Sequence, residues 1–469
     1  MSSDTSSQPG QPNSNRPLRV AIVGSGPAGF YAAAQLLASE DPRVEVDVFD
    51  RLPTPWGLVR FGVAPDHPKI KSVSRVFEKT ARMSGFRFHG NVEVGADVSH
   101  EQLAAAYDAV LYAVGAAGDR RLGIQGEDLP GSHAATEFVA WYNGHPDYAE
   151  IDFDLSSKRA VVVGNGNVAL DLARMLALSS EELAVTDIAD HAFQSLAASA
   201  VEEIVVLGRR GPVQAAFTNP ELRELADLGL ADVIVSKADL QLDPHSAAAL
   251  EQADATTKRN VEVLRDYSER PARGRPRRID LRFLVSPVAI EGERRVESIL
   301  VERNELVADA LGHLRARPTG DRERIDAGLV FRSIGYVGTP LPGVPFDGAS
   351  STVLNEQGRV VDPESRRPIP GVYAAGWIKR GPSGVIGTNK KCALQTTTLL
   401  LSDHAAGMLP EPRSSPDELL DQLRARGTHV VDYTGWEAID AHEQALGKPS
   451  GRPRVKLVRR DELLDRARS

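Results

Sequence analysis

A chain of 469 residues is about three times the length of an average domain, so more than one folded unit is expected. Apolar residues make up 42% and charged residues 25%, which excludes wholesale disorder, and a net charge of −9 argues against a nucleic-acid-binding protein. The single cysteine, Cys392, excludes an intramolecular disulfide, a cysteine-ligated iron–sulfur cluster and the redox cysteine pair of a disulfide reductase.

The first seventeen residues are rich in Ser, Pro, Gln and Asn, and we predict a disordered tail there. They lack the apolar stretch of a secretory signal. No apolar run in the chain approaches the ~18 residues that a membrane span needs. We therefore expect a cytoplasmic protein without a membrane span.

The first sequence motif is a glycine-rich turn between a predicted strand at 18–23 and a predicted helix. In the turn GSGPAG, Gly24 allows the tight bend, Gly26 allows close approach of a pyrophosphate, and Gly29 allows the helix to pack on the strand. The next predicted strand, 44–49, ends on Asp50, whose carboxylate can accept hydrogen bonds from a ribose diol. The order strand, turn, helix, strand and acid predicts a dinucleotide site.

A second glycine turn, GNGNVA at 164–169, follows a predicted strand at 160–163 and ends with Ala169 in the third small position. The following strand, 204–207, ends on Arg209 and Arg210 and not on an acid. Two guanidinium groups favour a ribose 2′-phosphate, so this site is predicted to prefer NADPH to NADH. Arg209 comes 45 residues after Gly164, well beyond the usual ~20, so we predict an insertion between the helix and the strand.

Two glycine turns with opposite charges at their rims indicate two different nucleotides. FAD with NADP(H) is the simplest pair, because a flavin accepts hydride from a nicotinamide. The predicted fold class is therefore α/β with two Rossmann-like dinucleotide-binding units.

Several longer motifs resemble the adrenodoxin reductase family of NADPH:ferredoxin reductases. They include LPTPWGLVRFGVAPDHPK at 52–69, VGNGNVALD at 163–171, GRRGPVQAAFT at 208–218, GWIKRGPSGVIGTNK at 376–390 and GRPRVKL at 451–457. The resemblance implies domains of glutathione-reductase type, with a discontinuous FAD-binding domain at 18–115 and 331–469 and an NADP-binding domain inserted at 116–330.

The resemblance also implies which residues contact the cofactors. Those expected at the flavin are Ala28, Asp50, Leu58, Val94, Trp377, Gly384, Val385 and Ile386. Those expected to hold NADPH are Arg120, Asn165, Gly166, Asn167, Val168, Arg209, Arg210 and Glu221, with Gly384 near the nicotinamide. This chain differs from the family at Asp50, where Glu is frequent; the shorter side chain keeps the acceptor role.

The catalytic candidates are His67, in a turn stiffened by two prolines, and Glu224. The family places both near the nicotinamide, which implies that they orient the carboxamide and move a proton. Hydride transfer between two rings needs positioning in a dry site more than acid–base chemistry, so we expect positioning residues more than proton-transfer groups. We predict no metal site.

The expected electron acceptor is a separate ferredoxin, because one cysteine cannot ligate a cluster, and we expect the reductase to be monomeric. A basic segment at 258–282 is a candidate docking patch for an acidic protein, although a solvated linker explains it equally well. Two other functions remain open: an NADPH-dependent flavin monooxygenase or diaphorase, and a non-catalytic FAD- and NADP-binding sensor.

Overall fold

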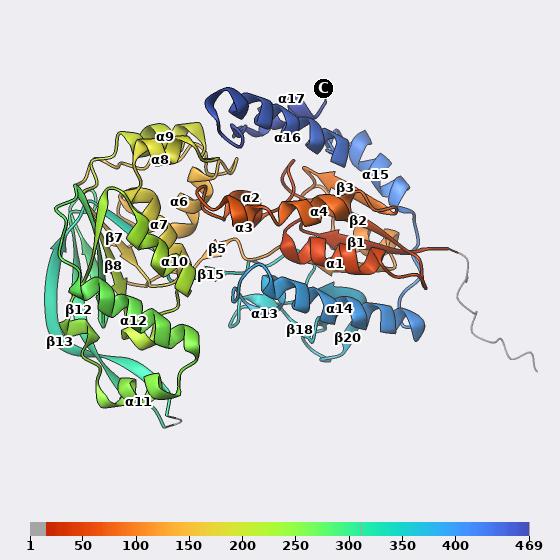
Figure 1. Ribbon diagram of the computed structural model, residues 1–469. Coiled ribbons are helices and arrows are strands. Elements are labelled where there is room, and N and C mark those ends of the chain that lie inside the picture. Colours follow the sequence, from red (N-terminus) through yellow and green to blue (C-terminus); the bar gives the residue numbers. More distant parts are fainter. Residues whose placement is uncertain (1–15, 311, 469) are drawn as a thin grey trace, which may run out of the picture.

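The computed structural model describes residues 16–310 and 312–468 and has a large sheet in each half of the molecule (Figure 1). Residues 1–15 of the predicted tail lie outside this description. The tail prediction extends too far at its end, because Arg16 Nη2 lies 2.6 Å from Asp108 Oδ1. No helix within the described ranges is both long and apolar enough to cross a bilayer.

The first sheet has seven strands in the order β18-β19-β20-β4-β1-β2-β3. The strands are β1 (Leu18–Val23), β2 (Val44–Asp50), β3 (Phe86–Gly90), β4 (Ala109–Tyr112), β18 (Asn355–Glu356), β19 (Arg359–Val361) and β20 (Pro368–Ala374). β1 pairs in parallel with β2 and β4, and β20 pairs in parallel with β4, although β20 follows β4 only after the whole second sheet. This sheet is therefore built from two separate stretches of chain.

The second sheet has six strands in the order β6-β14-β7-β8-β10-β9, and all its neighbours are parallel. The strands are β6 (Ser132–Ala134), β7 (Arg159–Val163), β8 (Glu203–Gly208), β9 (Ala231–Val235), β10 (Arg277–Phe283) and β14 (Leu329–Arg332). The apolar runs of β7, β8 and β14 are buried on both faces, with helices on one side and the antiparallel sheet described next on the other.

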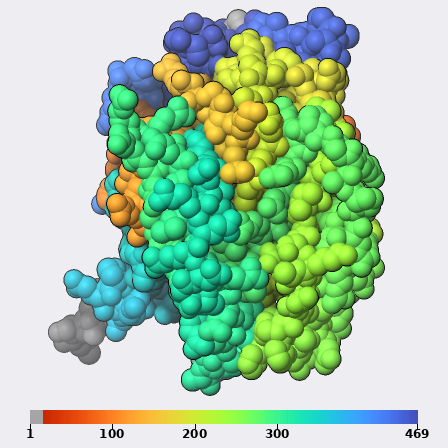
Figure 2. All heavy atoms as spheres, turned by 90° about the vertical axis from the view of Figure 1, so that its left-hand side faces the viewer, coloured from red at the N-terminus to blue at the C-terminus, as the bar shows by residue number. Residues whose placement is uncertain are grey.

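A three-stranded antiparallel sheet, which the sequence analysis did not identify, covers the outer side of the second sheet. It consists of β11 (Val285–Glu291), β12 (Ser298–Ala308) and β13 (Leu314–Asp326). The green-to-teal segment in Figure 2 belongs to this sheet, whose strand β13 is exposed along most of its length. Four short strands form two further ribbons: β5 (Gly118–Asp119) with β15 (Tyr336–Val337), and β16 (Phe346–Asp347) with β17 (Thr352–Val353).

The helices pack on the faces of both large sheets and cross between them. Those of the first half are α1 (Pro27–Leu37), α2 (Leu58–Phe61), α3 (Pro68–Lys71), α4 (Ser74–Ala81), α5 (His100–Ala106), α13 (Trp377–Arg380), α14 (Thr388–Ala405) and α15 (Pro416–Ala425). Those of the second are α6 (Ala135–Tyr142), α7 (Asn167–Ala177), α8 (Ser180–Ala184), α9 (Asp190–Ala197), α10 (Asn219–Glu224), α11 (Pro244–Gln252) and α12 (Ala255–Glu269). The last two, α16 (Tyr433–Gly447) and α17 (Arg460–Ala467), lie along the top of the molecule in Figure 1.

The strands predicted around the two glycine turns are confirmed within one residue at each end. β1 and β2 have the predicted bounds with Asp50 included, and β7 and β8 begin one residue earlier than predicted. The predicted insertion between α7 and β8 contains α8 and α9, which accounts for the long spacing between Gly164 and Arg209.

The domain division stays a prediction in its residue limits. The boundary at 330/331 falls inside β14, where Phe331 pairs with Val162 and Arg332 pairs with Val163. A boundary after residue 332 would keep that strand within the six-stranded sheet.

Candidate functional site

The first glycine turn connects β1 to α1 and leaves an opening at one of its three glycines. A Cβ atom on Gly24, whose φ is +105°, would lie 2.6 Å from Ala113 O, and one on Gly29 would lie 2.0 Å from Gly24 O. Packing alone therefore requires glycine at these two positions. A Cβ on Gly26 would meet nothing nearer than Gly57 Cα at 4.0 Å, so this side of the turn can admit a ligand against the α1 N-terminus.

Asp50 ends β2 and lies against the same turn. Its Oδ2 accepts hydrogen bonds from Ser25 N at 2.9 Å and Ser25 Oγ at 2.5 Å, and its Oδ1 accepts one from Leu52 N at 2.9 Å. These contacts fix a carboxylate at the rim of the turn, and Oδ1 keeps capacity for a further donor. The arrangement suits the hydroxyl groups of a ribose.

The C-terminal glycine-rich segment meets this turn from the other stretch of chain. A Cβ on Gly376 would lie 2.6 Å from Ala28 Cβ, which places the segment directly beside the start of α1. Trp377 Nε1 donates to Ser383 O at 3.2 Å, and its ring lies 5.4 Å from that of Tyr336. Gly26, Ala28 and Gly376 thus surround one cradle.

The remaining residues expected at the flavin lie on both sides of that cradle. Leu58 opens α2 after Gly57, and Val94 is buried in an apolar cluster with residues from the ends of β1 and β2. Ile386 packs on the core beneath α1, whereas Val385 is 59% exposed. Gly384 has a φ of +78°, and a Cβ there would lie 2.6 Å from Thr388 Oγ1.

The second glycine turn repeats the geometry of the first. Gly164 has a φ of +132°, and a Cβ there would lie 2.0 Å from Ser333 O, whereas a Cβ on Gly166 would meet no atom within 4 Å. The buried Nδ2 atom of Asn165 has no hydrogen-bond partner among the described residues. Asn167 Oδ1 accepts a hydrogen bond from Thr218 N at 2.7 Å. An open cradle and an unsatisfied donor are what a bound pyrophosphate would complete.

Arg209 and Arg210 are exposed at the end of β8, and within the described ranges neither forms an ion pair with a carboxylate. Arg210 Nη2 donates only to Gln214 O, at 3.4 Å. Burial, together with the charges of Arg209 and Arg315, lowers the pKa of Arg210. Two neighbouring arginines that are not paired with a carboxylate in the described ranges suit an incoming phosphate dianion.

Arg120 and Glu221 lie farther along this side. Arg120 N donates to Gly335 O at 3.1 Å, next to the β5–β15 ribbon. Glu221 is in the first turn of α10, and its buried Oε2 has no hydrogen-bond partner among the described residues. Val168 follows Asn167 in the first turn of α7. The contacts of these residues with NADPH stay a prediction.

His67 and Glu224 are in direct contact, although 157 residues separate them. His67 Nε2 lies 2.8 Å from Glu224 Oε2, and the imidazole is 8% exposed, whereas the carboxylate is 43% exposed. His67 precedes α3 in the first half of the molecule, and Glu224 ends α10 in the second. The pair therefore bridges the two halves and remains partly open to a ligand.

Arg174, on α7, contacts this pair through Glu224. The sequence analysis did not identify this residue. Its guanidinium donates to Asp66, to Asp171 and to Glu224 Oε2. Burial works to lower the pKa of Arg174, but Asp171 and Asp66 outweigh it and raise that pKa above its ordinary value. Burial raises the pKa of Asp171. Two of the motifs quoted above contain partners of Arg174: the motif at 52–69 contains Asp66, and VGNGNVALD contains Asp171.

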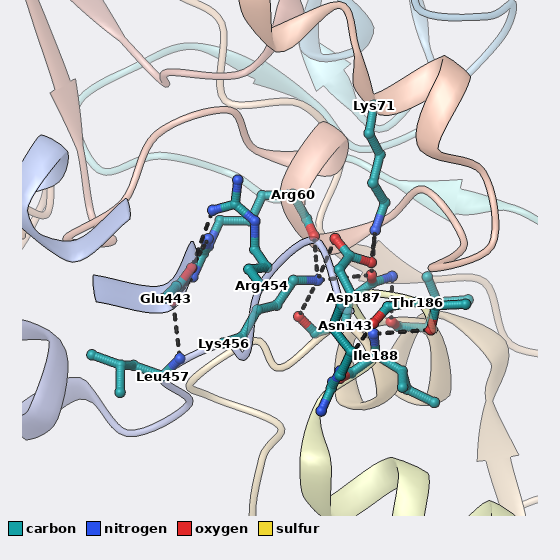
Figure 3. Close-up of polar contacts among 12 residues, drawn as sticks. Arg60, Lys71, Asn143, Thr186, Asp187, Ile188, Glu443, Arg454, Lys456 and Leu457 are labelled. Carbon is teal, nitrogen blue, oxygen red and sulfur yellow. Dashed lines mark hydrogen bonds and ion pairs between the residues drawn. The ribbon is translucent and has the colours of Figure 1, made fainter. Parts of the chain in front are cut away.

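A second ionic network between the halves, which we call the C-terminal clamp, is buried except at Lys71 and Arg454, which are half-buried (Figure 3). Its residues are Arg60, Lys71, Asn143, Asp187, Glu443, Arg454 and Lys456. Arg60 and Glu443 form a bidentate pair at 2.6 and 2.8 Å. Lys456 Nζ donates to Arg60 O and to Asn143 O and lies 3.4 Å from Asp187 Oδ2, so the chain end ties α2 to the second half.

The arginines at the C-terminal end of the candidate docking patch at 258–282 make internal contacts, whereas Arg259, Arg265 and Arg273 are exposed. Arg275 donates to Leu228 O and Ala231 O, Arg277 donates to Leu176 O and Leu178 O, and Arg278 pairs with Glu203 at 2.6 Å. Arg277 and Arg278 begin β10, at the opposite edge of the sheet from the second glycine turn. A surface pocket of about 750 Å³ lies at that edge, and its charged side chains largely pair with one another. Arg275 and Arg277 therefore bind backbone carbonyl groups, and Arg278, although exposed, is paired with Glu203, while docking of a ferredoxin on the rest of the segment stays a prediction.

Comparison with known proteins gives the family. A family model described as pyridine nucleotide-disulphide oxidoreductase matches residues 18–206. NADPH-ferredoxin reductase FprA of Mycobacterium tuberculosis strain H37Rv is 52% identical over 459 residues, which cover 96% of this chain and 99% of that protein. The mitochondrial NADPH:adrenodoxin oxidoreductase of Arabidopsis thaliana is 40% identical and covers 96% of this chain and 95% of its own length.

The solved structure of M. tuberculosis FprA in complex with NADPH superimposes with a TM-score of 0.92 at 50% identity, over 97% of this chain and all of that one. This confirms the predicted fold class of two Rossmann-like units, with the second inserted into the first. The chain belongs to the adrenodoxin reductase-like family of NADPH:ferredoxin reductases.

Proposed function

We propose that this protein is an FAD-dependent NADPH:ferredoxin reductase. The observation that carries the proposal is the presence of two open cradles in one molecule. One is rimmed by the carboxylate of Asp50, and the other by the guanidinium groups of Arg209 and Arg210. A nucleotide with a free ribose diol suits the first, and one with a 2′-phosphate suits the second.

The residues present suit both cofactors. The openings at Gly26 and Gly166 leave backbone N–H groups free at helix N-termini, where the pyrophosphate of FAD or of NADPH would lie. The unsatisfied Nδ2 of Asn165 and Oε2 of Glu221 lie in the half that would bind NADPH. When bound, NADPH supplies a hydride and FAD accepts it and delivers electrons singly.

The protein contributes positioning and a proton site. Trp377 and the glycines around it line the flavin cradle, where they would cover the bound ring and keep water from its reacting face. His67 and Glu224, 2.8 Å apart, can share one proton between Nε2 and Oε2, next to the junction of the two cradles. Holding the two ring systems in one fixed orientation lowers the entropic part of the barrier.

The acceptor in this proposal is a separate ferredoxin, and the reductase acts as a monomer in the cytoplasm. The names of the relatives support a ferredoxin acceptor. Cys392, the only cysteine of the sequence, is buried and cannot ligate a cluster in this chain.

The decisive experiment mixes the purified yellow protein anaerobically with NADPH and follows the flavin absorbance. Cytochrome c reduction is then measured with and without an added ferredoxin. We expect rapid flavin bleaching and cytochrome c reduction that depends on the ferredoxin. NADPH oxidation coupled to substrate hydroxylation would indicate a monooxygenase, and bound cofactors without any bleaching would indicate a sensor.

A further inference from the structure

Arg174 is the most highly connected buried cation at the junction of the two cradles. Its side chain is 3% exposed and donates four hydrogen bonds to three carboxylates. Nε lies 2.6 Å from Asp66 Oδ2, Nη2 lies 3.1 Å from Asp66 Oδ1 and 2.9 Å from Asp171 Oδ1, and Nη1 lies 3.1 Å from Glu224 Oε2. Such a planar, bidentate arrangement fixes the direction of each N–H group.

The three carboxylates are placed around His67. Asp66 is its immediate neighbour in the chain, and Glu224 contacts its Nε2 atom through the same Oε2 atom that Arg174 binds. The Glu224 side chain is 43% exposed, so without a second contact it could rotate into solvent. Arg174 holds it from the buried side, and by binding Asp66 it also fixes the turn that carries His67.

Arg174 also lies on the helix of the second glycine turn. α7 begins at Asn167, and Arg174 is seven residues farther on, or roughly 10 Å along the axis at 1.5 Å per residue. The helix whose N-terminus faces the NADPH cradle therefore carries the group that aligns His67 and Glu224. This rigid connection links the nucleotide position to the position of the pair.

We propose that Arg174 is a positioning residue for hydride transfer from NADPH, which holds Glu224 and the Asp66–His67 turn in the arrangement that the reaction needs. This proposal rests on the proposed reductase function and assigns no contact between Arg174 and a cofactor. Arg174 acts through Glu224 and His67.

The charged groups around Arg174 allow its positioning role to be tested through the pH dependence of the reaction. The groups that face the cluster from the surrounding elements are Asp66, His67, Lys71, Tyr142, Asp171, Glu224 and Tyr336. Removing the guanidinium charge leaves three carboxylates beside one imidazole. Protonation of the cluster then becomes easier. If the rate of flavin reduction depends on the protonation of this cluster, its pH profile therefore moves to higher pH.

The test measures the rate constant of anaerobic flavin reduction by NADPH, as a function of pH, in R174M, R174K and the wild type. The matched control is R223M, which removes an exposed arginine next to Glu224. For R174M we expect a rate roughly 100-fold lower, because small displacements of aligned groups have effects of that size. We also expect the affinity of R174M for NADP⁺ to stay within about threefold of the wild-type value. The midpoint of the pH dependence of its reduction rate should lie about one pH unit higher than in the wild type.

The lysine variant separates charge from geometry. R174K keeps the charge but loses the bidentate contact. We therefore expect its flavin-reduction rate to be roughly tenfold lower, with the same pH dependence as in the wild type. If R174M does not fold because its carboxylates lose their partner, R174K alone decides, since a wild-type rate in that variant would overturn the proposal. The proposal would also be overturned if R174M and R223M had the same flavin-reduction rate and the same pH dependence. Failure of the wild type to bleach with NADPH would instead refute the reductase function itself.

Discussion

The two glycine turns of this protein have nearly the same backbone and opposite rims. In each, one glycine has a positive φ and no room for a Cβ atom, at Gly24 and at Gly164, and another faces open space, at Gly26 and at Gly166. The rims differ, since the first carries the carboxylate of Asp50 and the second carries two arginines. The comparison shows that packing determines the shape of the turn. In our proposal, the residues at the tip of the next strand select the nucleotide.

The largest expected effect concerns a glycine that packing requires. Gly164→Ala forces a Cβ to within 2.0 Å of Ser333 O at a φ of +132°. We expect a loss of roughly 3 kcal/mol or more in the free energy of unfolding, from strain and overpacking. Chemical denaturation measures it, with Gly166→Ala as the matched control, because that Cβ meets no atom. Equal stability of the two variants would contradict the distinction.

A glycine that faces the ligand should affect binding and not folding. For Gly26→Leu we expect a folded protein whose flavin content is at least about tenfold lower, because the side chain occupies the cradle beside Gly57. Flavin absorbance per mole of protein, together with circular dichroism, provides the measurement. Full flavin occupancy in a folded Gly26→Leu protein would show that the first turn does not hold FAD.

The rim residues should change selectivity alone. In our proposal Arg209 and Arg210 both bind the 2′-phosphate of NADPH, so we expect Arg209→Ala combined with Arg210→Ala to raise the KM for NADPH roughly 10- to 100-fold. The KM for NADH should stay within about threefold. Steady-state assays with both coenzymes test this. An equal rise in the KM for NADPH and for NADH would contradict the assignment of Arg209 and Arg210 to the 2′-phosphate. Since neither arginine pairs with a carboxylate in the described structure, the change should leave the fold intact.

The elements that are continuous in sequence could be predicted, because strand, turn and helix follow one another locally. The bounds of β1 and β2 and the insertion before β8 follow from the apolar runs and the spacing of the motifs. The contact between His67 and Glu224 was expected only from the family resemblance, since no periodicity connects residues 157 positions apart.

Long-range ionic contacts account for most of what the sequence analysis missed. Arg174 reaches Asp66 across 108 residues, and a buried arginine in a helical pattern looks like any other charged position. The same difficulty explains why the sequence left the role of Arg275 and Arg277 open, since their side chains bind backbone carbonyl groups. A basic run in sequence says nothing about which of its members are already occupied by internal acceptors.

The C-terminal clamp has a consequence for biosynthesis. Arg60 and its partner Glu443 are 383 residues apart, so at 5–20 residues per second a ribosome needs roughly 20 to 80 s to make the second after the first. During that time the Arg60 side chain of α2 has no acidic partner, whereas Lys71 of α3 needs only Asp187, which is 116 residues away. The first glycine turn can form early, but the relative placement of the two halves becomes final only when the last stretch of chain has left the ribosome.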